Sequence, residues 1–107
     1  MIYELRIYVA APGKIRALHD RFAKHTLGFF EKHGMKSIGY WTEDVGESNR
    51  IVYILAFNDL GDMERKWAAF RADPGWQKVV AESERDGPLV AQVINRVLRP
   101  TAYSPLK

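Results

Sequence analysis

The sequence predicts a small α+β domain with a four-stranded antiparallel sheet and two helical segments. Four stretches have the alternating or continuous apolar residues of β-strands, and the stretches between them repeat apolar residues at helical spacing. The predicted order is strand, helix, strand, strand, helix, strand. At 107 residues the chain has room for one domain, residues 1–107, with one hydrophobic core.

The first predicted strand covers residues 2–9, where side chains alternate between two sets. Apolar side chains form one set and mostly polar ones the other, which is the period of a strand with one apolar face. The first set is Tyr3, Leu5, Ile7 and Val9, and the second set is Glu4, Arg6 and Tyr8. Pro12 and Gly13 then end the strand.

The first predicted helix follows from Lys14 and ends at Gly34. Its apolar residues fall within one narrow arc, while charged residues lie away from that arc. The arc consists of Ile15, Leu18, Phe22 and Phe29. Glycine is common just beyond a helix C-terminus, so Gly34 marks the end of this helix.

A β-hairpin is predicted after the first helix. The range 36–43 holds good strand formers, among them Tyr40 and Trp41. Residues 46–49 then form the turn into the run Ile51–Phe57. Both sides of this second arm are apolar, which is typical of an interior strand that is covered on both faces. We therefore expect another surface to cover its second face.

The second predicted helical segment has Met63, Trp67 and Phe70 at positions i, i+4 and i+7, which makes them core residues. The segment restarts at Asp73 and Pro74, because an aspartate can cap a helix and a proline can occupy its first position. The last predicted strand covers residues 89–99, where side chains again alternate between two sides.

This order of elements is the split β-α-β, ferredoxin-like arrangement, in which the helices pack on one face of an antiparallel sheet. The first and third strands are then central, and the other sheet face is bare. We expect Glu4, Arg6 and Tyr8 to lie on this bare face, away from the helices. An exposed apolar patch favours association, so two sheets are expected to pack face to face as a barrel with a shared interior.

Composition and charge argue against several classes of protein. The chain has no cysteine, which removes disulfides and thiolate metal sites and agrees with a reducing compartment. The net charge of +3 is scattered along the chain, so no nucleic-acid partner is predicted. The longest apolar run, Ile51–Phe57, is too short to span a bilayer, and a signal-peptide pattern is missing. We therefore predict no membrane partner and a cytoplasmic location.

No metal or cofactor is predicted. The three histidines, His19, His25 and His33, all lie on the first helix at separations that place no two of them one turn apart, as a helical metal pair requires. No P-loop or dinucleotide glycine motif is present. His25 borders the apolar arc and could reach a pocket as a base, but a partly buried structural histidine is the more ordinary interpretation.

Five stretches of the sequence resemble the NIPSNAP family, which belongs to the dimeric α/β-barrel superfamily. They are Tyr3–Tyr8, Pro12–Lys14, Gly39–Gly46, Asp73–Trp76, and Leu98–Thr101 with Tyr103–Pro105. None is specific alone, but together they run almost end to end in the expected order. The resemblance implies a homodimer with a central cavity and no defined biochemical activity. The superfamily includes cofactor-independent monooxygenases, polyketide cyclases and haem-binding branches.

The candidate ligand-binding residues are Glu4, Arg6, Tyr8, Trp41 and Arg96. Arg6 can clamp a carboxylate, phenolate or carbonyl oxygen, Tyr8 can donate its hydroxyl, and Glu4 can act as a base or hold Arg6. Alternatively, Glu4 and Arg6 form an ion pair that only fixes assembly. Trp41 can form the wall of an apolar pocket or simply pack. Arg96 can add a second cation to the same cavity or remain solvated at a barrel mouth.

These residues are compatible with three functions. The predicted function is a homodimer that binds a small, partly aromatic or amphipathic molecule in the barrel cavity, with Arg6 and Tyr8 at its polar end. The first alternative is an enzyme of the cofactor-independent monooxygenase or cyclase type, which needs a real cavity and a positioned acid or base. The second alternative is a structural or protein-interaction domain, which predicts a filled interior.

Overall fold

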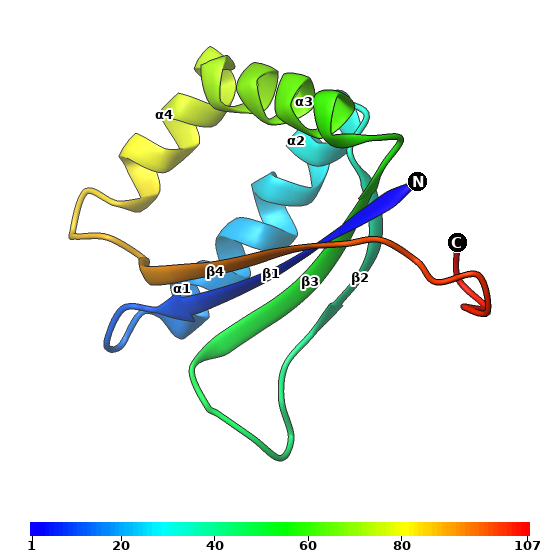
Figure 1. The fold of residues 1–107 in the computed structure, drawn as a ribbon. Coiled ribbons are helices and arrows are strands. Elements are labelled where there is room, and N and C mark those ends of the chain that lie inside the picture. The colour runs from blue at the N-terminus through cyan, green and yellow to red at the C-terminus, as the bar shows by residue number, and fades with distance from the viewer.

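The computed structural model describes residues 1–107 and confirms the predicted order of strands and helices (Figure 1). The strands are β1 (Ile2–Ala10), β2 (Lys36–Trp41), β3 (Arg50–Phe57) and β4 (Val90–Leu98). The helices are α1 (Ile15–Arg21), the π-helical turn η1 (Phe22–Thr26), α2 (Leu27–Lys32), α3 (Leu60–Ala72) and α4 (Pro74–Ser83). None of these helices combines the length and the apolar character that crossing a bilayer requires.

The sheet is antiparallel with the strand order β2-β3-β1-β4, so the first and third strands are central as predicted. In Figure 1 all helices lie on one side of this sheet, and the β2–β3 connection and the C-terminal residues extend away from it. This arrangement is the ferredoxin-like α+β fold. The register pairs Arg6 with Tyr53 on β3 and with Asn95 on β4.

The first predicted helix contains an irregularity that changes which residues face the core. Residues 22–26 form a π-helical turn between α1 and α2. A π-turn holds more residues than an α-turn, so it shifts the phase of everything that follows. Phe22 is buried as predicted, but beyond the turn Phe30 is buried at 1 % exposure, whereas Phe29 is only partly buried. The prediction that Phe29 faces the core is therefore correct only in part.

The core lies between the helices and one face of the sheet. On β3 the side chains of Tyr53 and Leu55 are fully buried there, and Leu18 of α1 packs in the same cluster. Trp67 and Phe70 contribute from α3, as their helical spacing predicts. Burial of large apolar side chains in one such cluster is the main stabilising term for a domain of this size.

The polar row of β1 faces the helices, which corrects the prediction that it lies on the bare face. Trp67 on α3 donates its indole N–H to Glu4 at 2.6 Å. Tyr8 packs edge-on against Phe22 of η1, with ring centroids 5.5 Å apart. The predicted alternation of β1 is right, but its two sides are exchanged, because a period of two does not reveal which side the helices cover.

The bare face of the sheet is therefore mainly aliphatic, with Arg96 and Trp41 beside its aliphatic residues. Directly paired residues of antiparallel strands share a face, so Ile7 lies between Val52 on β3 and Ile94 on β4. Leu5 is paired in the same way with Ile54. These five residues form the bare apolar face. The C-terminal residues lie at one end of this face, where Ile54 lines a shallow pocket together with Tyr3, Leu98 and Leu106.

Asp73 joins α3, α4 and the end of α2. Its Oδ1 accepts the backbone N–H of Gly75 at 2.8 Å and so caps α4, as predicted, with Pro74 in the first turn. Its Oδ2 accepts from Lys32 Nζ at 2.7 Å and from His33 Nε2 at 2.8 Å. The hydrogen bonds from Lys32 and His33 hold the pKa of Asp73 well below the ordinary value of 3.8.

This lowered pKa predicts an acid-dependent loss of stability. A carboxyl with a depressed folded-state pKa stabilises the fold above the unfolded-state pKa, and the stabilisation is lost as the pH falls toward the folded-state pKa. The difference in unfolding free energy between wild type and Asp73→Asn should therefore shrink below about pH 4. Urea unfolding across this range measures it. Asp20→Asn is the control, because Asp20 is 71 % exposed, and a pH-independent difference for Asp73 would contradict the prediction.

Candidate functional site

A cluster of hydrogen-bonded side chains lies at the centre of the sheet, on its helix-covered face. β1 supplies Glu4, Arg6 and Tyr8, since alternate residues of a strand point to the same side. The neighbouring elements add Tyr53 from β3, Trp67 from α3 and Asn95 from β4. We call these six residues the Arg6 cluster.

Glu4 anchors the Arg6 cluster. Its side chain is 1 % exposed, and one carboxylate oxygen accepts from Trp67 Nε1. The other oxygen accepts from Arg6 Nη1 at 3.0 Å and from Asn95 Nδ2. A buried carboxylate is tolerated only when it is paired and hydrogen-bonded, and here both conditions are met. Of the two roles predicted for Glu4, this geometry supports the one in which it holds Arg6.

Arg6 is held on several sides. Its Nε donates to Tyr53 Oη at 2.8 Å and its Nη2 donates to Tyr8 Oη at 3.3 Å. Its guanidinium carbon lies 4.3 Å from the centroid of the Trp67 ring, within the range of a cation–π interaction. Burial acts to lower the pKa of Arg6, but Tyr53, Tyr8 and Glu4 outweigh it and raise the pKa. Arg6 is therefore a fixed positive charge.

Tyr53 connects the charged cluster to a group of aromatic rings. Burial raises the pKa of Tyr53 well above its ordinary value of 10.0, so its hydroxyl keeps its proton at neutral pH. The Tyr53 ring stacks on Tyr40 at 5.5 Å and meets Phe22 edge-on at 5.3 Å. Such aromatic contacts add stabilisation beyond the area that they bury. Tyr53 thus has both a polar role beside Arg6 and a packing role in the core.

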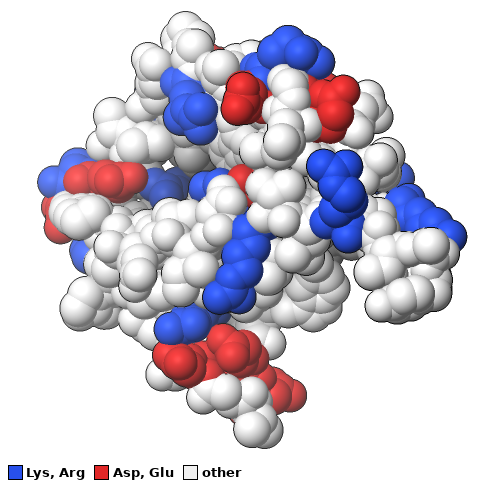
Figure 2. All heavy atoms as spheres, viewed as in Figure 1, with Lys and Arg blue, Asp and Glu red and all other residues white.

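One edge of the Arg6 cluster is open to solvent along β4. Val93 and Val97 are paired with Tyr8 and Glu4, so they point to the helix-covered side, yet they are 44 % and 42 % exposed. The Arg6 side chain keeps 14 % of its surface exposed. Figure 2 shows a hollow between the α3–α4 layer and β4, with Lys or Arg and Asp or Glu atoms visible inside it. The helices therefore leave a groove beside β4.

Arg96 and Trp41 lie on the opposite face of the sheet from the Arg6 cluster. Arg96 is paired with Leu5, and Trp41 is paired with Val52, so both point toward the bare apolar face. The prediction that Arg96 adds a cation to the same cavity is therefore wrong in its placement. Trp41 is 50 % exposed, and its ring lies close to Gly39, where an added Cβ would come within 2.6 Å of the indole.

His25 and His33 are also separate from the Arg6 cluster. His25 is exposed on the outer surface, where it lines a polar groove together with Arg21 and Glu82. His33 binds Asp73 at the end of α2. His19 lines a different pocket, between the first helical segment and β2. His25 is therefore not the partly buried histidine that was predicted, and it does not reach the Arg6 cluster as a base.

Sequence reasoning did not assign Tyr53, Trp67 or Asn95 to the site. Trp67 was predicted as a core residue only, although its indole N–H requires a partner when buried. Asn95 sits among apolar residues of β4, and a polar residue on the inward side of a strand is a signal that was available. Tyr53 likewise places a polar hydroxyl within the apolar run of β3. The partners themselves are distant in sequence and became visible only in the fold.

Comparisons with known proteins agree on one family. The NIPSNAP family model matches residues 3–105. Protein NipSnap of Drosophila melanogaster is 30 % identical over 105 residues, which cover 97 % of this chain and 36 % of that protein. The chain thus spans about a third of the length of this curated relative.

Solved structures extend the likeness to three dimensions. A NIPSNAP family protein with unknown function from Agrobacterium tumefaciens has a TM-score of 0.86 and 31 % identity, covering 100 % of this chain and 94 % of that one. A proposed antibiotic biosynthesis monooxygenase from Nitrosomonas europaea has a TM-score of 0.64 and 12 % identity, covering 96 % of this chain and 100 % of that one. At such low identity the second likeness concerns the fold alone.

Proposed function

The chain belongs to the NIPSNAP family, and on this premise we propose that it is a cytoplasmic homodimer that binds a small amphipathic molecule. The observation that carries the proposal is a charged, partly exposed Arg6 beside the exposed side chains of Val93 and Val97. This combination offers one polar and one apolar contact in the groove beside β4. The absence of cysteine supports a reducing compartment such as the cytoplasm.

Dimerisation is supported by the bare apolar face. Leu5, Ile7, Val52, Ile54 and Ile94 lie together on a sheet face that no helix of the chain covers. A contiguous apolar surface of this kind gains free energy when it is removed from water. A two-fold axis would bring two identical faces together, because the same patch then meets itself. The two sheets would form the inner layer of the dimer, with the helices and the Arg6 clusters outside it.

Ile54→Asp is expected to convert the dimer to a monomer. The substitution places a charge on the bare apolar face, where association would bury it without a partner. Sedimentation equilibrium at micromolar concentration should give the mass of two chains for the wild type and of one chain for the variant. Val45→Asp is the matched control, since Val45 is 96 % exposed in the β2–β3 loop. A monomeric wild type would contradict the proposed dimer.

The ligand class follows from the N–H donors of Arg6 that have no hydrogen-bond partner within the chain. A guanidinium has five N–H donors, and here Nε, Nη1 and Nη2 each have one partner, which leaves two donors. Arg6 can therefore bind a carboxylate, phenolate or carbonyl oxygen that enters the groove. Val93 and Val97 can contact the apolar part of the same molecule. We propose an aromatic or alkyl-chain compound with an oxyanion at one end.

A matched pair of probes tests this ligand class. The aromatic acid 4-phenylbutyrate should bind to the wild type, whereas its neutral amide should bind about tenfold more weakly, because it lacks the charge that faces Arg6. Val93→Trp fills the groove without touching the Arg6 hydrogen bonds and should abolish binding. Val45→Trp serves as the control. Isothermal titration gives the affinities, and equal binding of acid and amide would contradict a role for Arg6.

A structural role is the second candidate function. It is favoured by one observation, namely that Glu4, Arg6, Tyr8 and Tyr53 satisfy one another within the chain. In this case the cluster only fixes the packing of β1, β3 and α3. A dimer that binds neither probe, in wild type and in Val93→Trp alike, would support this second function over ligand binding.

A further inference from the structure

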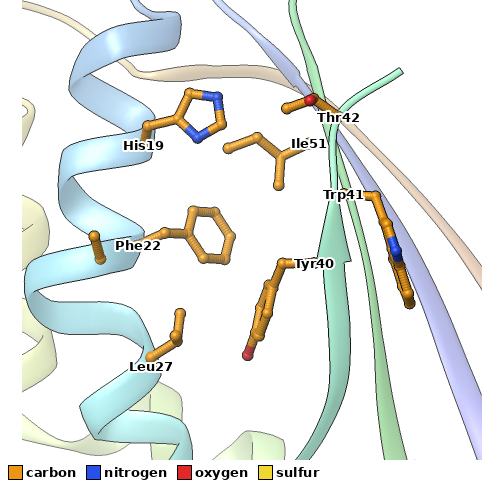
Figure 3. Close-up of a pocket in the computed structure, with 8 residues that line it drawn as sticks. His19, Phe22, Leu27, Tyr40, Trp41, Thr42 and Ile51 are labelled. Carbon is orange, nitrogen blue, oxygen red and sulfur yellow. The ribbon is translucent and has the colours of Figure 1, made fainter. Parts of the chain in front are cut away.

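A separate pocket of about 320 Å³ lies between the first helical segment and β2, on the side of the fold opposite to β4. Its lining includes His19, Phe22, Ala23, Leu27, Tyr40 and Thr42. Figure 3 shows the side chains of the helical segment pointing across the pocket toward β2. The Trp41 ring lies on the far side of β2, so this residue borders the pocket with its backbone. A volume near 300 Å³ is the lower end of the range for small-molecule sites.

Aromatic rings form the walls of this β2 pocket. Phe22 and Tyr40 lie with centroids 6.1 Å apart and ring planes at 64°. Tyr40 is stacked on Tyr53 from behind, and its hydroxyl is within 2.5 Å of Ser37 Oγ. Phe22 is backed by Tyr8 and Tyr53. Phe22 and Tyr40 therefore contact each other edge-to-face and form one joint aromatic wall, held by packing, against which a flat ring can lie.

One end of the β2 pocket is polar, and the Tyr40 hydroxyl, which is bonded to Ser37 Oγ, points toward the other end. In Figure 3 His19 and Thr42 lie at one end, Leu27 lies at the other, and Phe22 and Tyr40 lie between them. No lysine, arginine, aspartate or glutamate lines the pocket. A charged ligand would therefore lose its hydration without gaining a counter-charge. A neutral ligand with one hydrogen-bonding group at the His19 end avoids this cost.

We infer that the β2 pocket binds a small neutral phenol, with its ring packed against Phe22 and Tyr40 and its hydroxyl at His19 and Thr42. The imidazole of His19 can accept the phenol O–H, and the Thr42 hydroxyl can donate to the phenol oxygen. This site is distinct from the groove beside β4, because Tyr8 and Tyr53 bind Arg6 on one side and pack against Phe22 on the other.

The test is a titration of the full-length chain with 2-naphthol and with naphthalene, followed by amide chemical shifts. We expect 2-naphthol to shift the amides of residues 19–27 and 40–42 most. It should bind about tenfold more tightly than naphthalene, the margin that one buried hydrogen bond supplies. Largest shifts elsewhere, or no shift with millimolar 2-naphthol, would overturn the inference.

Three variants sharpen the test. His19→Phe keeps a ring but removes the acceptor of the phenol O–H, so the preference for 2-naphthol over naphthalene should fall to what the Thr42 hydroxyl alone supplies. His25→Phe alters an exposed histidine of the same helical segment that lies outside the pocket, and it should retain the tenfold preference. Ala23→Trp adds bulk at an exposed lining residue and should abolish binding of both probes. Unchanged 2-naphthol binding in a folded Ala23→Trp, or an unchanged preference in His19→Phe, would contradict the inference.

Discussion

Glu4→Leu is expected to lower the free energy of unfolding by about 3–5 kcal/mol, the cost of breaking a buried ion pair from one side. Glu4 accepts hydrogen bonds from Arg6, Trp67 and Asn95, and its side chain is 1 % exposed. Removing the carboxylate leaves the Arg6 charge without its counter-ion and the indole N–H of Trp67 without an acceptor. A leucine side chain supplies neither a negative charge nor a hydrogen-bond acceptor.

Urea unfolding followed by tryptophan fluorescence measures this effect. Glu4→Gln should lower the free energy of unfolding by less than Glu4→Leu does, because the amide oxygen can still accept the hydrogen bond from Trp67. The double variant Glu4→Leu/Arg6→Met should recover part of the loss, since it removes the unpaired charge together with its partner. If Glu4→Leu and the double variant were equally unstable, the ion pair would not be the source of the effect.

Tyr53→Ala is expected to lower the free energy of unfolding by about 3–5 kcal/mol, the range for truncating a large buried aromatic side chain. Tyr53 is completely buried and packs against Tyr8, Phe22, Phe30 and Tyr40. Tyr53→Phe separates the ring from its hydroxyl. It should cost about 1–3 kcal/mol, because Arg6 Nε then loses its acceptor in a buried setting.

The control for both variants is Tyr103→Ala, because Tyr103 is 87 % exposed and packs on no core residue. Its unfolding free energy should stay within about 0.5 kcal/mol of the wild type. Tyr53→Ala should also remove 2-naphthol binding, since Phe22 and Tyr40 lose the ring that backs them. A stable Tyr53→Phe with wild-type affinity for 4-phenylbutyrate would show that the hydroxyl does not help to place Arg6.

The local pattern along the chain was enough to predict the elements and their order. Alternation in residues 2–9 predicted β1, and the apolar run of residues 51–57 predicted an interior strand. Asp73 and Pro74 predicted the break between α3 and α4 because capping depends on neighbouring residues alone. The ferredoxin-like topology followed from that order. The phase of the first helical segment beyond Phe22 did not follow, since a π-turn leaves no mark in a pattern with the α-helical period.

The residues of the site were predicted only where their contacts are local. Glu4 and Arg6 are two positions apart on one strand, so their pairing could be expected from the sequence. Tyr53, Trp67 and Asn95 reach the same cluster from 47, 63 and 91 positions away. No periodicity connects positions so distant, and the folded sheet brings them together.

The sequence pattern does not determine which side of β1 the helices cover. Strand alternation divides β1 into two sets of side chains, and the charges of Glu4 and Arg6 favoured the uncovered side for one of them. In the fold that set lies under the helices, because Trp67, Asn95 and Tyr53 replace the water that the charges would otherwise need. The apolar set then becomes the bare face. Side-chain alternation is a property of the strand, whereas burial depends on the partners that the fold supplies.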